Sequence, residues 1–94
     1  MRPTDEAVAV VTGGSRPPGS EIARALARRG WAVVVVYLRD QWRAEAVVEE
    51  ILAAHETALS VRADLTDELD VERLFSETKA VFGGVDLVVH GGAE

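Results

Sequence analysis

The sequence has no cysteine, few basic residues and no long apolar run, and each lack excludes some functions. Without cysteine, the 94 residues form no disulfide, no thiolate metal site and no cysteine nucleophile, which is typical of a reducing compartment. Ten Lys and Arg against sixteen Asp and Glu give a net charge of -6, which argues against binding to nucleic acid or to an anionic membrane. The longest apolar stretch, WAVVVVYL, is too short to span a bilayer, and the N-terminus lacks a signal-peptide pattern. We therefore expect a cytoplasmic protein without a metal site.

The residues that are present form an alternating α/β pattern. Short apolar runs at residues 7–11, 31–37, 58–62 and 85–90 predict strands. Amphipathic segments predict helices from about residue 19 to Gly30, over residues 40–54, and from Asp70 to Gly83-Gly84. Because this alternation is the signature of βαβ units, we expect a Rossmann-type parallel sheet of strand order 3-2-1-4, flanked by helices and truncated after the fourth strand. Residues 1–94 are expected to form one partial NAD(P)-binding domain.

The pattern also predicts which side chains are buried. The first, second and fourth runs are apolar on both faces, so we expect helices to cover these strands on both sides. Asp70 is the expected N-cap of the third helix. The helical spacing places on one side of each helix Ile22, Ala25, Leu26 and Arg29 in the first, Ala44, Val47, Val48, Ile51 and Leu52 in the second, and, as a buried stripe, Val71, Leu74, Phe75, Thr78 and Phe82 in the third.

A glycine-rich stretch, TGGSRPPGS at residues 12–20, follows the first strand and precedes the first helix. Glycines there let the backbone approach a pyrophosphate, and the helix N-terminus directs N–H groups at negative charge. The alternative is a tight turn whose glycines serve only packing. Pro17 and Pro18 carry no N–H, so they remove two donors and predict weak cofactor binding.

The end of the second strand indicates which dinucleotide binds. An acid about 20 residues after such a loop binds a ribose 2'-OH, whereas an arginine accommodates a 2'-phosphate. This position holds Tyr37, Leu38 and Arg39, and Arg16 lies within the loop. We therefore expect NADP(H) to be preferred over NAD(H); the alternative is that both arginines are ordinary surface residues.

Together these segments resemble the N-terminal part of the short-chain dehydrogenase/reductase family. VAVVTGGSRPPGSEIARALARRG resembles the family's Thr-Gly-x-x-x-Gly-x-Gly loop and first helix. RADLTD resembles the segment after the third strand, in which Asp64 would bond the adenine and Leu65 would line its pocket, although Asp64 is equally suited to capping that turn. GVDLVVHGGA resembles the fourth strand, with His90, Gly91, Gly92 and Ala93 in place of Asn-Asn-Ala-Gly. The resemblance implies cofactor-binding roles for Thr12, Gly13, Ser15, Arg16, Gly19, Tyr37, Arg39, Asp64, Leu65, His90, Gly91 and Gly92.

The resemblance also implies an oxidoreductase that passes hydride between nicotinamide and an alcohol or carbonyl carbon. The family's catalytic Ser and Tyr-x-x-x-Lys come later than residue 94. Within the chain, the one tyrosine, Tyr37, is followed four positions later by Gln41, and the one lysine is Lys79 in the third helix. We therefore assign no catalytic residue and expect an N-terminal fragment that is inactive alone.

Two other function classes remain open. The first is a non-enzymatic nucleotide-binding module that pairs with itself or with a complementing chain through an exposed fourth-strand edge, LVV. The second is another Rossmann-type enzyme such as a methyltransferase, which would place an acid where Tyr37 stands. His90 has the chemistry of a general base, but no nucleophile or carboxylate partner is identifiable by spacing, so we interpret it as a strand-end histidine.

Overall fold

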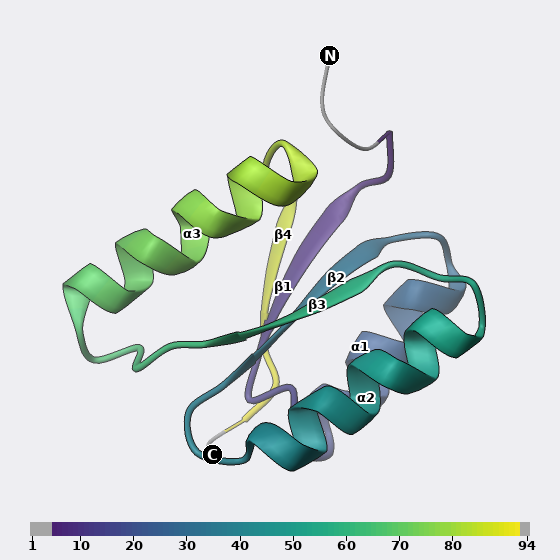
Figure 1. Ribbon diagram of the computed structural model, residues 1–94, viewed down its shortest axis with the longest axis horizontal. Coiled ribbons are helices and arrows are strands. Elements are labelled where there is room, and N and C mark those ends of the chain that lie inside the picture. Colours follow the sequence, from purple (N-terminus) through teal and green to yellow (C-terminus); the bar gives the residue numbers. More distant parts are fainter. Residues whose placement is uncertain (1–4, 93–94) are drawn as a thin grey trace.

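The computed structural model of the chain describes residues 5–92, and these fold into a parallel sheet with helices on both faces (Figure 1). None of the helices in this range is long and apolar enough to cross a bilayer. The elements in chain order are β1 (Val8–Thr12), α1 (Gly19–Arg28), β2 (Ala32–Tyr37), α2 (Gln41–Ala53), β3 (Ala58–Arg62), α3 (Glu68–Phe82) and β4 (Leu87–His90).

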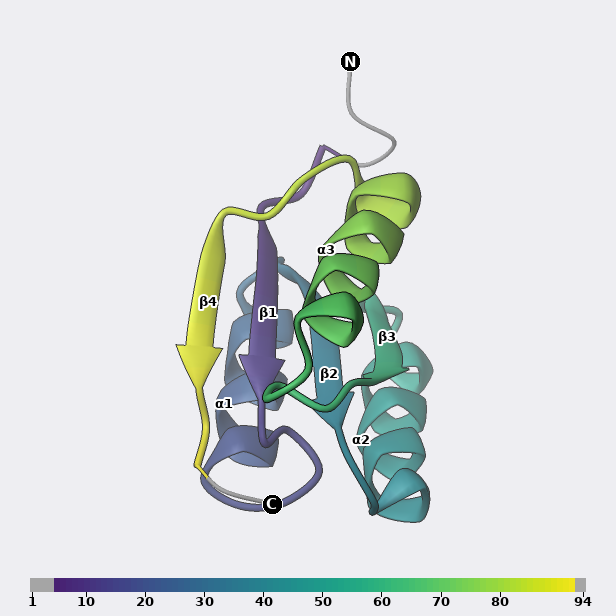
Figure 2. The same cartoon turned by 90° about the vertical axis from the view of Figure 1, so that its left-hand side faces the viewer.

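The sheet has the order β3-β2-β1-β4, and all its strand pairs are parallel. Helices α1 and α2 cover one face of the sheet and α3 lies over the other, as Figure 2 shows. The predicted fold class and strand order are therefore confirmed. From β1 the chain adds β2 and β3 on one side and then returns to add β4 on the other side, so the strand order reverses at β1 and creates a topological switch point between β1 and β4.

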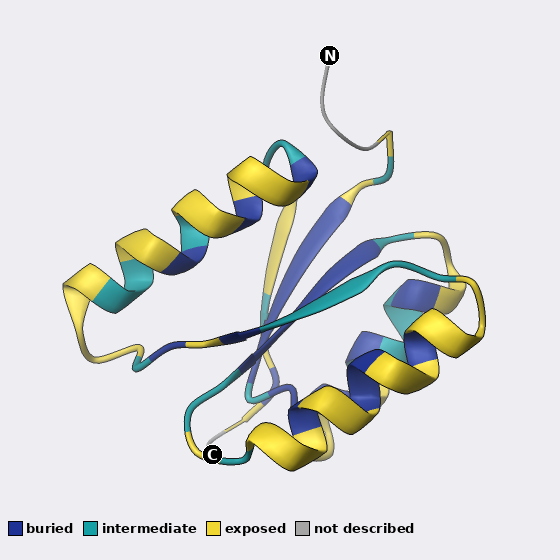
Figure 3. Ribbon diagram, viewed as in Figure 1, coloured by how far each residue is buried: buried dark blue, intermediate teal, exposed yellow. Residues whose placement is uncertain are grey.

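Two apolar clusters hold the layers together, one on each face of the sheet. Because side chains alternate along a strand, β1 and β2 supply both clusters: Val8 and Val10 face α3, whereas Val11 faces α1 and α2. Leu74 and Phe82 complete the cluster under α3. In Figure 3 β1 is buried throughout, and β2 is buried up to Val36.

The expectation that helices cover β4 on both sides is wrong. Leu87 is 36% exposed and Val88 is 41% exposed, and the strand is almost entirely at the surface in Figure 3. β4 is the edge of the sheet and pairs with β1 alone among the described strands. The apolar run therefore predicted the strand correctly but did not predict that its side chains are exposed.

Three details of the helices also differ from expectation. The N-cap of α3 is Asp67, whose side chain accepts the N–H of Leu69, and Asp70 lies inside the first turn. Leu52 is exposed on α2. α1 buries Gly19, Ser20, Ala23 and Ala27, whose small side chains let it approach the sheet closely, and of the predicted side Leu26 packs against the core while partly buried.

Candidate nucleotide-binding site

A cleft of about 290 Å³ opens where β1, β2 and β3 end. In parallel α/β sheets, ligands bind at this edge, beside the switch point. Five of the predicted site residues line the cleft: Gly13, Tyr37, Asp64, Leu65 and Gly92. The remaining lining residues are Val36, Leu38, Ala63 and Thr66. The other seven predicted residues lie outside this lining, in the glycine loop, after β2 and at the end of β4.

The glycine loop packs directly against the end of β4. The N–H of Gly91 donates to the carbonyl of Thr12 at 2.8 Å, and a Cβ on Gly91 would lie 2.7 Å from that same oxygen. Gly13 has a φ of 59°, and a Cβ there would collide with the carbonyl of Gly92. Close backbone packing therefore requires both glycines. For Gly13, in the first loop, this is the role that the sequence left open as the alternative to ligand binding.

The start of α1 leaves backbone donors without acceptors. Pro17 and Pro18 have no N–H, and the N–H of Ser20 donates to the carbonyl of Arg16 at 3.0 Å. Within residues 5–92 no acceptor takes the N–H of Gly19 or that of Glu21. The positive end of the helix dipole and two open donors therefore remain at this terminus, a combination that favours an anion.

Ser15 carries a buried hydroxyl in the same loop. Its side chain is 4% exposed, and Oγ has no hydrogen-bond partner among the described residues. Native structures contain few such buried unsatisfied groups, and a water, an ion or a polar group of a ligand commonly completes their hydrogen bonding. Ser15 is thus the predicted site residue whose environment most directly indicates a ligand.

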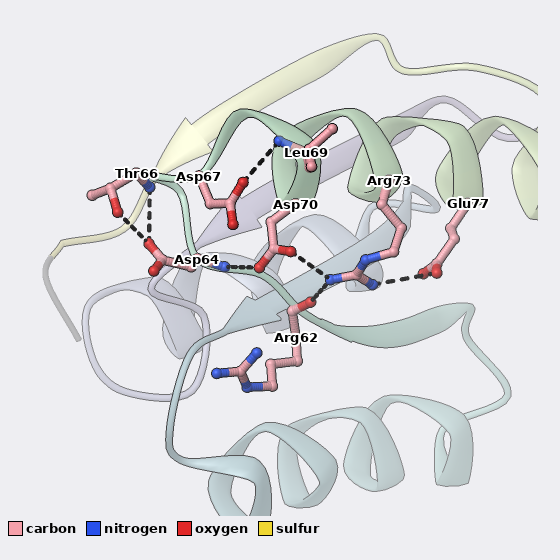
Figure 4. Close-up of polar contacts among 8 residues, drawn as sticks. All are labelled: Arg62, Asp64, Thr66, Asp67, Leu69, Asp70, Arg73 and Glu77. Atoms are coloured by element: carbon pink, nitrogen blue, oxygen red, sulfur yellow. Dashed lines mark hydrogen bonds and ion pairs between the residues drawn. The ribbon is translucent and has the colours of Figure 1, made fainter.

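The carboxylate of Asp64 is held ionised in the turn after β3. The Thr66 hydroxyl and the Thr66 N–H donate to its Oδ1 at 2.6 and 2.9 Å (Figure 4). These two donors hold the pKa of Asp64 below its usual value, with smaller contributions from the charges of Arg62 and Arg39. Asp64 therefore does cap this turn through Oδ1, and it presents a charged acceptor at the cleft.

Asp70 and Arg73 on α3 fix the position of this turn. Asp70 Oδ2 accepts the N–H of Asp64 at 2.8 Å. Arg73 donates to the Arg62 carbonyl at 2.8 Å and pairs with Asp70 at 3.6 Å and Glu77 at 3.3 Å, as Figure 4 shows. Sequence reasoning missed Arg73 and predicted Asp70 only as a helix N-cap, without its contact to Asp64. Asp70 lies three positions before Arg73 and Glu77 four positions after it, so helical spacing could have predicted both ion pairs. Spacing cannot predict the hydrogen bond from Arg73 to the carbonyl of Arg62 in β3.

The two arginines predicted to select the cofactor lie in different loops: Arg16 follows β1 and Arg39 follows β2. Arg39 is exposed, and its charge contributes to lowering the pKa of Asp64. Arg16 Nε lies 3.2 Å from Asp40 Oδ2, and Arg43 Nε lies at the same distance from the same oxygen. The sequence had drawn attention to Arg16 but not to its carboxylate partner or to Arg43.

His90 joins the end of β4 to the end of β1. Its Nδ1 lies 3.0 Å from the Thr12 hydroxyl oxygen, which is also 3.4 Å from the carbonyl oxygen of Val89. His90 thus supplies a polar link between strand ends in a segment where the resemblance places asparagines. Ala93, the last residue of that segment, lies outside the described residues.

Comparison with known proteins gives one consistent result. A family model described as short chain dehydrogenase matches residues 7–93. The hydroxynaphthalene reductase-like protein Arp2 of Metarhizium robertsii is 44% identical over 82 residues. The structure of a dehydrogenase/reductase from Sinorhizobium meliloti superimposes on this chain with a TM-score of 0.86 and 43% sequence identity. The structure of a short chain dehydrogenase from Burkholderia cenocepacia in complex with NADP superimposes with a TM-score of 0.83 and 38% sequence identity.

These matches cover nearly all of this chain and about a third of the relatives. The match to the Metarhizium protein covers 87% of this chain and 31% of that protein. The two structures are matched over 89% and 87% of this chain, and over 33% and 34% of theirs. Because the family match runs from β1 through β4, the chain belongs to the short chain dehydrogenase family.

Proposed function

We propose that this chain is the NADP(H)-binding part of an oxidoreductase that passes hydride between nicotinamide and an alcohol or carbonyl carbon. One structural relative at 38% identity contains NADP, which supports a nicotinamide dinucleotide as the ligand. The observation that carries the proposal is the buried, unpartnered hydroxyl of Ser15, two residues beyond the cleft-lining Gly13.

Three parts of NADP(H), the adenine, the pyrophosphate and the 2'-phosphate, have a matching group among the described residues. The adenine would enter the cleft beside Asp64 and Leu65. The pyrophosphate would lie at the start of α1, where the N–H groups of Gly19 and Glu21 are open. A 2'-phosphate would meet the arginines after β1 and β2, since a planar guanidinium pairs well with phosphate.

Removing the Ser15 hydroxyl is expected to affect NADPH binding without lowering the stability of the fold. Ser15→Ala removes a group with no partner among the described residues, so the free energy of unfolding should stay unchanged or rise. If the cofactor completes that hydroxyl's hydrogen bonding, NADPH should bind about tenfold more weakly to the variant. Calorimetric titration measures the binding, and Ser76→Ala on the exposed side of α3 is the matched control.

Two outcomes would contradict the cofactor proposal. One is a wild-type chain that binds no NADPH while remaining folded by circular dichroism. The other is tighter binding of S-adenosylmethionine than of NADPH, because this would support the methyltransferase alternative. Equal NADPH affinities for wild type and Ser15→Ala would remove Ser15 from the site.

We further propose that residues 1–94 alone do not catalyse hydride transfer. Tyr37 lines the cleft, but the fourth residue after it is Gln41, and Lys79 is on α3. No Tyr-x-x-x-Lys pair therefore exists among these residues. Incubation with NADPH and a panel of ketones should give no loss of nicotinamide absorbance; measurable turnover by the 94-residue chain would overturn this point.

The exposed edge of β4 supports a second function, association through strand pairing. Leu87 and Val88 are apolar and exposed on a strand that pairs on one side only among the described residues. Open strand edges of this kind form hydrogen bonds with other chains. Size-exclusion chromatography with light scattering should show mass increasing with concentration, and Val88→Lys should reduce it; a wild-type monomer at high concentration would contradict association.

A further inference from the structure

One carboxylate oxygen is shared by two arginines in the segments that follow β1 and β2. Arg16 Nε and Arg43 Nε each lie 3.2 Å from Asp40 Oδ2. Arg16 comes from the glycine loop after β1, whereas Asp40 directly precedes α2 and Arg43 is in its first turn. The ion pairs therefore join two loops that the sequence separates by 24 residues.

This cluster belongs to a local concentration of positive charge in an acidic chain. The segments 13–18, 38–43 and 62–66, at and after the carboxyl ends of β1, β2 and β3, hold four arginines and two carboxylates, whereas the chain as a whole has a net charge of -6. The arginines are Arg16, Arg39, Arg43 and Arg62, and the carboxylates are Asp40 and Asp64. The side chains of Arg16 and Arg43 are 56% and 62% exposed, and that of Asp40 is 20% exposed. The carboxylate is thus the least exposed member of the trio, and the guanidiniums lie around it.

We infer that Asp40 is an internal counter-anion that limits how strongly the site prefers a dinucleotide with a 2'-phosphate over one without it. The inference rests on the proposed cofactor site and adds a specificity-determining role for Asp40 and Arg43. It follows from the geometry: the Asp40 carboxylate already pairs with both guanidiniums, so a phosphate that binds their remaining N–H groups lies next to a negative charge.

The two cofactors experience Asp40 differently. The 2'-phosphate of NADPH carries negative charge, so the carboxylate repels it and competes with it for the same two guanidiniums. The 2'-OH of NADH is neutral, and a carboxylate after β2 is a suitable acceptor for a ribose hydroxyl. Asp40 therefore weakens NADPH binding while leaving NADH binding unchanged or strengthening it.

The test compares NADPH and NADH affinities for wild type and Asp40→Asn. Asp40→Asn should raise the ratio of NADPH to NADH affinity about three- to tenfold, since two half-exposed ion pairs are removed as competitors. Asp40→Ser is a second variant that removes the same charge. Asp5→Asn is the matched control, because it makes the same charge change at an exposed residue before the opposite end of β1.

A further variant separates competition from a change in structure. In an Arg16→Gln, Arg43→Gln background, adding Asp40→Asn should leave the affinity ratio almost unchanged, because the arginines through which Asp40 acts are gone. Suppose that the wild type binds both dinucleotides but Asp40→Asn leaves the ratio of NADPH to NADH affinity unchanged, or Asp5→Asn raises that ratio equally. Either result would overturn this inference and leave the cofactor proposal intact. Failure of the folded wild type to bind either dinucleotide would overturn both.

Discussion

Asp70 Oδ2 accepts the backbone N–H of Asp64 at 2.8 Å, which ties the first turn of α3 to the segment leaving β3. The same segment provides Asp64, Leu65 and Thr66 to the wall of the cleft. The shape of the candidate site therefore depends on a residue that does not line it.

Asp70→Ala should lower the free energy of unfolding by about 1–2 kcal/mol, because a partly buried N–H loses a charged acceptor. It should also weaken NADPH binding, since the turn at Asp64 is no longer held. Urea denaturation and calorimetric titration measure the two effects. Asp67→Ala is the comparison: it removes the N-cap at a cost of about 1 kcal/mol but leaves the Asp64 N–H paired. Equal loss of NADPH affinity in both variants would contradict the specific role of Asp70.

Thr66→Val should raise the pKa of Asp64 toward its ordinary value. The variant removes the hydroxyl that makes the largest contribution to lowering this pKa and retains the Thr66 N–H. A carboxyl whose pKa is lowered on folding stabilises the fold above its unfolded pKa, and this stabilisation disappears as pH falls through the folded pKa. Wild type should therefore lose more stability than Thr66→Val on acidification below about pH 4. Carboxyl titration by NMR measures the shift; an unchanged Asp64 titration would refute the assignment.

Replacing both loop prolines, Pro17→Gly with Pro18→Ile, should tighten NADPH binding about tenfold or more. The replacement adds backbone N–H groups to a loop segment that has none at these positions, next to the open donors of Gly19 and Glu21. NADPH titration of the double variant and of each single variant, with circular dichroism as a check on folding, measures the change. Equal affinity in a folded double variant would show that the prolines do not limit binding.

The fold was predictable from sequence because its main determinants are local. Valine-rich runs at β1 and β2, a glycine loop between β1 and α1, and amphipathic helices between strands together permit few topologies. The open edge of β4 was anticipated, but the exposure of its faces was not, because Leu87 and Val88 are typical of a strand that helices cover on both sides.

The site was only partly predictable because its polar contacts join distant segments. Gly13, Asp64 and Leu65 were identified from motifs, and all three line one cleft. Asp70 was interpreted as an N-cap because a helix-start pattern fits both it and Asp67. The pairs between Arg16 and Asp40, and between Thr12 and His90, connect segments whose approach becomes visible only when the strands are placed side by side.

NADPH titration into the isotope-labelled chain, followed by the backbone amide signals in NMR, tests the cofactor proposal most directly. Saturable shifts should concentrate on Gly13, Ser15, Asp64, Leu65 and Gly92, with further shifts at the start of α1. Helix α3 beyond its first turn should be nearly unaffected and provides the internal control. Absence of shifts in the folded chain, or shifts centred on β4 or the far end of α3, would contradict the assignment of this cleft as a cofactor site.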